Sequence, residues 1–159
     1  MTVAPIRRTA HTKAPPAKAF EIFTGQIGRW WPKGNGVGPQ PLVEVVIQPG
    51  VGGRWFERDA EGHETQWGCV LEWDPPGRLV LGWQLNREKR FDPHLITEVE
   101  LTFRAAPDGG TDVLLEHRNL ERFGQDAVQW LSTIGGGWTQ KLGEYADYAN
   151  YDDLPDQEE

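Results

Sequence analysis

Hydrophobic and polar positions alternate along the middle of the chain, which predicts a series of antiparallel strands. Val99, Leu101 and Phe103 alternate with charged or polar neighbours, the pattern of a strand with one buried and one solvated face. Turn sequences rich in Pro, Gly and Asp separate such runs and predict consecutive hairpins. The predicted strands are 6–12, 42–48, 53–58, 65–74, 78–85, 96–104 and 111–118.

Apolar residues that recur about every 3.6 positions predict the helices. Two prolines at 15 and 16 suit the entry of a first helix that Gly25 ends, and a second helical turn is expected at 27–31. A long helix is predicted at about 126–151, where one apolar stripe contains Leu131, Ile134, Trp138, Leu142, Tyr145 and Ala149. The resulting fold class is α+β, with the order β-α-α-β6-α and a curved antiparallel sheet of about seven strands around the last helix.

The long helix carries Gly135, Gly136 and Gly137 beside its apolar stripe, and each glycine weakens a helix by about 1 kcal/mol relative to alanine. One interpretation is a kink, or a close approach of the helix backbone to the sheet. The other is missing side-chain volume, which would leave a pocket with aromatic walls. The sequence leaves both open.

Trp30 and Trp31 are adjacent indoles on a short element, followed by Pro32. Neighbours on such an element are not expected to point into one core together, so at least one should face a loop, a cleft or a partner. Either they cap the entrance of a cavity, or both anchor the short helices to the sheet.

Composition narrows the classes of function. The chain has 159 residues and a formal net charge of −8, which disfavours nucleic acid as a partner because phosphate binding depends on Lys and Arg. We expect one domain at 1–151, an acidic disordered tail at 152–159, no membrane span, and a cytoplasmic location. The single cysteine, Cys69, is predicted to be a buried inert thiol that shares a strand face with Trp67 and Leu71.

Signals for catalysis are few, so the sequence favours binding over enzyme activity. Ser132 is the only serine and lacks the glycine-flanked elbow of a hydrolase, and the four histidines lack metal-ligand spacing, so no metal or cofactor is predicted. Strand parity places Glu57 and His117 on the inner face. They are either an acid and base pair inside the cup or residues with ordinary hydrogen bonds or solvent contacts.

Several stretches resemble the activator of Hsp90 ATPase homologue 1-like branch of the SRPBCC proteins, within the START and Bet v 1-like helix-grip superfamily. They are the segments 30–32, 49–55 and 70–79 and the late Gly137, Trp138 and Leu142. This resemblance implies a helix-grip fold with a cavity for an apolar molecule. The predicted ligand-binding residues are Trp30, Trp31, Trp55, Trp67, Trp83, Phe103, Leu115, His117, Ile134 and Trp138.

Within that branch the chain is similar to the calicheamicin self-resistance protein, through segments 53–57, 59–62, 82–86 and 101–103. The similarity implies a drug-reactive glycine in the turn around Gly109.

The expected function is binding of a lipid-like or polyketide-like molecule for carriage, sequestration or antibiotic self-resistance. The alternatives are a polyketide cyclase, dehydratase or hydrolase using Glu57 and His117, and an Hsp90-associated protein. The last ranks third because the asparagine- and tryptophan-rich domain of the eukaryotic co-chaperones is not recognised here.

Overall fold

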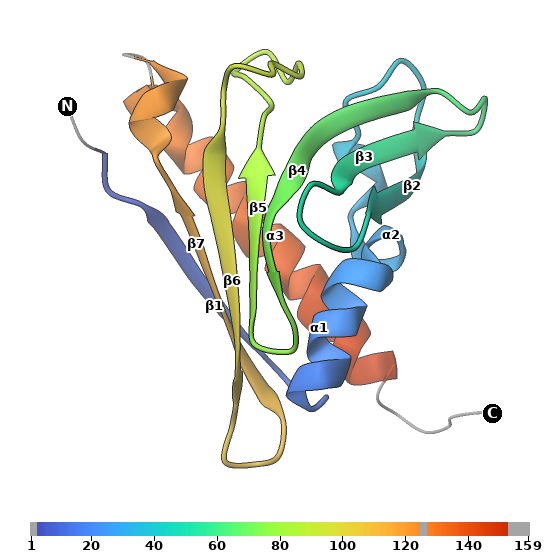
Figure 1. Cartoon of the computed structure of the whole chain (residues 1–159), viewed down its shortest axis with the longest axis vertical. Coiled ribbons are helices and arrows are strands. Elements are labelled where there is room, and N and C mark those ends of the chain that lie inside the picture. The colour runs from blue at the N-terminus through green and yellow to red at the C-terminus, as the bar shows by residue number, and fades with distance from the viewer. Residues whose placement is uncertain (1–2, 125–126, 153–159) are drawn as a thin grey trace.

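The computed structural model describes residues 3–124 and 127–152 (Figure 1). The predicted order of elements is confirmed. The expected helix start at 126 and, apart from Asp152, which ends the last helix, the expected tail at 152–159 lie outside the described residues. The elements are β1 (Ile6–Thr12), α1 (Pro16–Gly25), α2 (Ile27–Trp30), the 3₁₀ turn η1 (Lys33–Asn35), β2 (Leu42–Ile47), β3 (Arg54–Asp59), β4 (Glu64–Asp74), β5 (Arg78–Trp83), β6 (Thr97–Ala105), β7 (Thr111–Arg118), η2 (Leu120–Phe123) and α3 (Ala127–Asp152).

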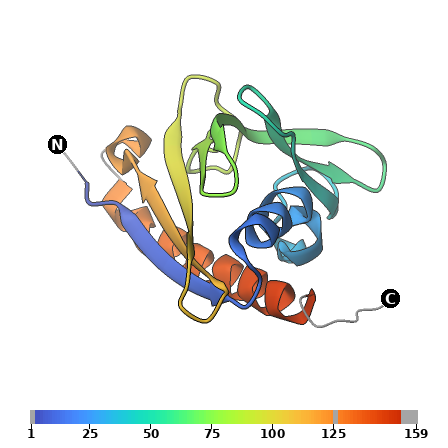
Figure 2. The same ribbon diagram turned by 60° about the horizontal axis from the view of Figure 1, so that its bottom comes forward.

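The seven strands form one antiparallel sheet in the order β1-β7-β6-β5-β4-β3-β2. All neighbours after β1 are joined in chain order, as consecutive hairpins require. Figure 2 shows the sheet curling around the helices, with α3 lying along the side of β1 and α1 and α2 inside the opposite arm of the curve. The sheet therefore has an inner face that packs on helices and an outer face that meets solvent.

Two β-bulges correct the predicted alternation in β4. The register of β4 shifts opposite Trp55 and Phe56 in β3, and again at Leu71 opposite β5. Each bulge inserts one residue and so reverses which side chains face inward. Cys69 stands opposite Gly82 on the outer face and is half-buried, whereas Trp67 is buried on the inner face. The expectation that Cys69 shares the core face is therefore wrong.

The outer face of the sheet carries a ladder of ion pairs. Arg118 on β7 contacts Glu98 and Glu100 on β6, and Arg78 on β5 contacts Glu100 and Glu72. Exposed pairs of this kind contribute only about 0–1 kcal/mol each. Their main consequence is that these charged side chains lie outside the cup.

Large apolar side chains fill one end of the cup, which we call the filled end. Tyr145 of α3 packs edge-on against Phe23 and Trp30, with ring centroids 5.3 Å apart in both pairs. Its hydroxyl donates a 2.8 Å hydrogen bond to the carbonyl of Ala19. The filled end consists of Phe20, Phe23, Trp30, Phe103, Leu142, Tyr145 and Ala149, all buried.

Candidate functional site

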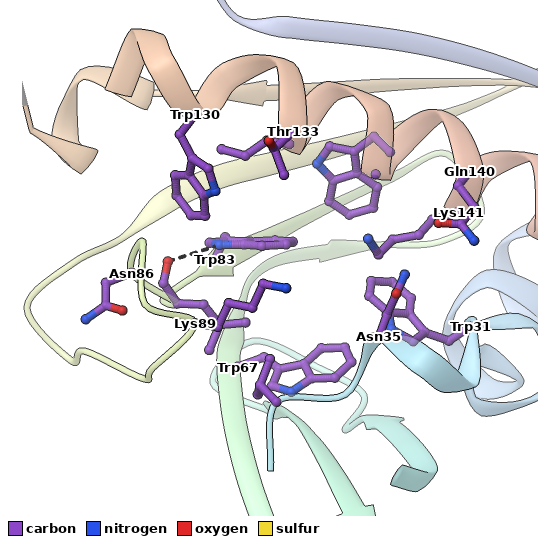
Figure 3. A pocket seen from close by; sticks show the side chains of 15 residues that line it. Trp31, Asn35, Trp67, Trp83, Asn86, Lys89, Trp130, Thr133, Gln140 and Lys141 are labelled. Carbon is purple, nitrogen blue, oxygen red and sulfur yellow. Dashed lines mark hydrogen bonds between the residues drawn. The ribbon is translucent and has the colours of Figure 1, made fainter. Parts of the chain in front are cut away.

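A pocket of about 200 Å³ lies at the other end of the cup, which we call the pocket end (Figure 3). Residues from β4, β5, α3, η1 and the loop after β5 line it. Exposed lining residues, including Thr133, Lys89 and Gln140, form its mouth. Five indoles line it, those of Trp31, Trp67, Trp83, Trp130 and Trp138.

The indoles hold one another in place. Trp31 lies 5.0 Å from Trp67 and 6.2 Å from Trp138 between ring centroids, and Trp83 lies 5.6 Å from Trp138. Trp55 packs behind Trp67 and Trp83. The N–H groups of Trp31 and Trp55 are buried without an acceptor among the described residues, and an unpaired buried donor costs about 1–3 kcal/mol.

The adjacent tryptophans belong to different ends of the cup. Both are buried, Trp30 to 4% and Trp31 to 3% exposure. Trp30 donates from its indole to the carbonyl of Ile22 and packs in the filled end. Trp31 lines the pocket. Their ring centroids are nevertheless 5.7 Å apart and both indoles belong to one core cluster, so the expectation that neighbours on this element would not share a core is wrong.

Glu57 anchors the turn beside the pocket. Its carboxylate is buried and accepts hydrogen bonds from the backbone N–H groups of Val37 (2.6 Å) and Gly38 (3.1 Å) and from the indole of Trp67 (2.9 Å). A Cβ atom on Gly36 or Gly38 would come within 3.0 Å of this carboxylate, so glycine lets the turn approach it. Glu57 thus fixes both the rim residue Val37 and the wall residue Trp67.

His117 lies behind the pocket wall in a closed hydrogen-bond chain. Trp138 donates to its Nδ1 at 3.1 Å, and its Nε2 lies 2.7 Å from the hydroxyl of Thr97. Burial lowers the pKa of His117 to about 3, so the ring is neutral at pH 7. Because Nδ1 accepts, Nε2 carries the proton and donates to Thr97. The chain positions the Trp138 indole that faces the pocket.

Of the two alternatives for Glu57 and His117, the structure has ordinary hydrogen bonds and not an acid and base pair. Each has its own hydrogen-bond partners, and no contact between the two is found among the described residues. Strand parity placed both inside the cup, as the structure has them. Strand parity could not show that the carboxylate of Glu57 accepts hydrogen bonds from the Trp67 indole and from the backbone at 37–38.

The structure places half of the ten predicted ligand residues at the pocket. Trp31, Trp67, Trp83, Ile134 and Trp138 line it. The other five do not line it: Trp30 and Phe103 are in the filled end, and Trp55, Leu115 and His117 are fully buried in the wall. Gly109 lies in the exposed β6–β7 turn, at the bottom of Figure 1, whereas the β5–β6 loop that borders the pocket is at the top.

Each glycine of the triplet at 135–137 has a different environment. Gly135 is buried against β1, where a Cβ atom would lie 2.6 Å from the guanidinium of Arg8. Gly136 faces open space. Gly137 lines the pocket, and its Cβ would lie 3.1 Å from Nζ of Lys141. Gly137 therefore fits the interpretation of missing volume, whereas a Cβ atom at Gly135 would meet the end of a flexible side chain and not the backbone of the sheet.

Sequence reasoning missed the polar part of the lining. These residues are Asn35, Asn86, Lys89, Thr133, Gln140 and Lys141. The five other than Lys141 carried no hydrophobic signal, and they lie in η1, in the β5–β6 loop or on the polar side of the helical stripe. The position of Lys141 could have been noticed in the sequence. It stands one helical turn after Gly137, so its side chain can extend back over that glycine.

Comparison with known proteins assigns the family. The model for activator of Hsp90 ATPase homolog 1-like protein matches residues 13–149. The chain belongs to this family. Its seven-stranded helix-grip fold agrees with that of the solved relatives, and no curated protein matches it.

The chain is similar to several solved structures, including these three. An anthrahydroquino-gamma-pyrone synthase, Txn09, is 30% identical, with 92% of this chain and 97% of that chain covered and a TM-score of 0.65. The self-sacrificing resistance protein CalC from Micromonospora echinospora is 27% identical over 98% of both chains, with a TM-score of 0.68. The Aha1 dimer from Colwellia psychrerythraea is 16% identical over 93% and 97%, with a TM-score of 0.66, and shows the fold alone.

The family and the pocket together support binding of a hydrophobic small molecule at the level of the family. Among the described residues, none of the helices is both long and apolar enough to span a membrane.

Proposed function

We propose that this protein binds a compact aromatic molecule, polyketide-like in character, for carriage or sequestration. The observation that carries the proposal is the pocket of about 200 Å³ enclosed by five indoles. An engineered cavity of about 150 Å³ accommodates benzene. The space therefore suits a system of one or two fused rings. Sequestration would serve self-resistance, the role that the description of CalC gives to that protein.

Two leucine variants one residue apart on α3 test this proposal. Gly137→Leu places a side chain in the pocket, whereas Gly136→Leu adds the same side chain where no atom lies within 4 Å of the Cβ position. Both replace a helical glycine, so their effect on helix propensity is matched. Isothermal titration with 2-naphthamide should show binding to the wild type and to Gly136→Leu, and at least ten-fold weaker binding to Gly137→Leu. Equal affinities in all three proteins would refute the pocket as the binding site.

A second candidate is catalysis on such a ligand, of the polyketide cyclase, dehydratase or hydrolase kind. The 30% identity with the synthase Txn09 favours it. The polar groups that would meet a bound ligand are Asn35, Thr133 and Lys141 rather than the enclosed His117. Mass spectrometry of aromatic polyketide precursors incubated with the protein tests it. A product that wild type and Gly136→Leu form and Gly137→Leu does not would establish catalysis, and unchanged precursors would leave binding as the function.

A further inference from the structure

The charge of the pocket lining narrows the class of ligand, an inference that rests on the proposed function. Fifteen of the described residues line the pocket; two of them are lysines, Lys89 and Lys141, and none of the fifteen is Asp or Glu. The whole chain has the opposite balance, with 24 acidic and 16 basic residues. The pocket is thus a cationic region in an acidic protein.

Lys141 extends into the pocket rather than into solvent. Its Nζ lies 5.1 Å from the ring centroid of Trp31 and 5.8 Å from that of Trp138. It reaches this place by folding back along α3 over Gly137, where a Cβ atom would lie only 3.1 Å from the ammonium. In Figure 3 the ammonium ends of Lys141 and Lys89 both point into the space between the indoles.

Neither lysine has an acidic partner among the described residues. Arginines elsewhere do, as Arg78 and Arg118 on the outer face each contact two or more carboxylates. The indole faces attract the Lys141 ammonium but do not neutralise it. Burial, and then the charge of Lys89, lower the pKa of Lys141 to about 8. The structure therefore holds a partly desolvated cation whose counter-charge the described part of the chain does not supply.

The backbone at Lys89 is consistent with a role for its side chain. Lys89 has a φ of 61°, in the left-handed region that favours glycine or asparagine. Asn86 builds the turn, since its side chain accepts from the N–H groups of Glu88 and Arg90 and its carbonyl accepts from that of Lys89. A glycine would suit this turn better, so the lysine adds a pocket cation rather than stability.

We infer that the pocket binds an aromatic anion, a carboxylate or an acidic phenolate on one or two fused rings. The rings lie among the indoles and the negative group lies against the ammonium of Lys141, with Lys89 as the second cation at the mouth. Such a ligand supplies the missing counter-charge where solvent screening is weak, and a charge-assisted hydrogen bond there is stronger than one at an open surface.

Three probes of one shape test the inference by titration calorimetry: 2-naphthoate, its neutral amide 2-naphthamide, and the cation 2-naphthylmethylammonium. The wild type should bind the carboxylate at least ten-fold more tightly than the amide, and the cation more weakly than either. Lys141→Met keeps the length of the side chain and removes the charge, and Lys141→Gln is a second variant if that protein folds poorly. Both should lose most of the preference for the carboxylate and retain binding of the amide.

Lys13→Met is the matched control, because it changes the net charge equally from a position beside the β6–β7 turn, away from the pocket. It should keep the full preference. If the wild type binds the amide as tightly as the carboxylate, or if Lys141→Met and Lys13→Met behave alike, the anion inference fails while binding in the pocket stands. If none of the three probes binds to the wild type, and the wild type and Gly137→Leu give the same titration, the proposed function fails together with the anion inference.

Discussion

The two ends of the cup are formed by the same helix and the same sheet, yet one is packed and the other is hollow. At the filled end α3 contributes Leu142, Tyr145 and Ala149, which close the space against α1 and β6. At the pocket end it contributes Gly137 and Lys141, which do not. The residues of α3 that pack the core and those that leave space for a ligand therefore lie in different parts of the same helix. The filled end supplies the packed core, and the pocket end keeps indole donors and a cation that have no hydrogen-bond acceptor or acidic partner in the described part of the chain.

The largest effect is expected from Tyr145→Ala at the filled end. The change removes a fully buried ring that contacts Phe23 and Trp30, together with the hydrogen bond to Ala19. Truncation of a buried aromatic costs about 3–5 kcal/mol, because the cavity does not close. Urea unfolding measures the free energy of unfolding. Gly137→Leu, which adds volume at the pocket end, should lose none of it. A loss below about 1 kcal/mol for Tyr145→Ala would contradict the division into two ends.

The filled end could largely be predicted from the sequence. The helical stripe gave Leu142, Tyr145 and Ala149 as buried, and strand alternation gave Phe103. These positions follow from one local period each, 3.6 for a helix and 2 for a strand. The order of elements followed in the same way, since short turns rich in Pro, Gly and Asp separate most of the consecutive strands.

The pocket end could not be predicted with the same success, for three physical reasons. Bulges in β4 interrupt the period of 2, which moved Cys69 to the outer face. Trp30 and Trp31 are adjacent and in ring contact, yet only Trp31 lines the pocket, a difference that no local period predicts. Lysines 89 and 141 carry no hydrophobic signal, and only their fold-dependent placement brings them to the pocket.

A smaller loss of stability than for Tyr145→Ala is expected from Glu57→Gln, which changes the rim of the pocket end. The amide retains one acceptor oxygen but presents an NH₂ group to a backbone N–H or to the Trp67 indole, which are donors. Hydrogen bonds to a charged group contribute about 1.5–3 kcal/mol, so we expect a loss of that size in the free energy of unfolding. Hydrogen exchange should show faster exchange at the amides of Val37 and Gly38.

Glu61→Gln is the control for this variant, because Glu61 is exposed in the β3–β4 turn. It should change neither stability nor exchange at 37–38. If Glu57→Gln leaves both amides as protected as in the wild type, Glu57 does not hold the rim.

The last effect is a dependence of stability on pH below 6.5, which His117 contributes from behind the pocket wall. Burial lowers the pKa of His117 to about 3 from 6.5. Between these values the unfolded chain binds a proton and the folded chain does not, so the free energy of unfolding rises with pH. This stability is complete above pH 6.5 and is lost on acidification, by about 1.4 kcal/mol for each pH unit.

His117→Gln cannot titrate, so its urea midpoint should fall less than that of the wild type between pH 6.5 and 5. Titration of His11 does not produce the same change of stability with pH. Hydrogen bonds to Asp112 and then Asp108 raise the pKa of His11, so its stabilising effect is complete below pH 6.5 and is lost as pH rises above it. Parallel pH profiles for wild type and His117→Gln would mean that His117 is not held neutral. The hydrogen-bond chain that positions Trp138 at the pocket would then be wrong as well, because Nδ1 of a protonated ring is a donor and cannot accept from the indole.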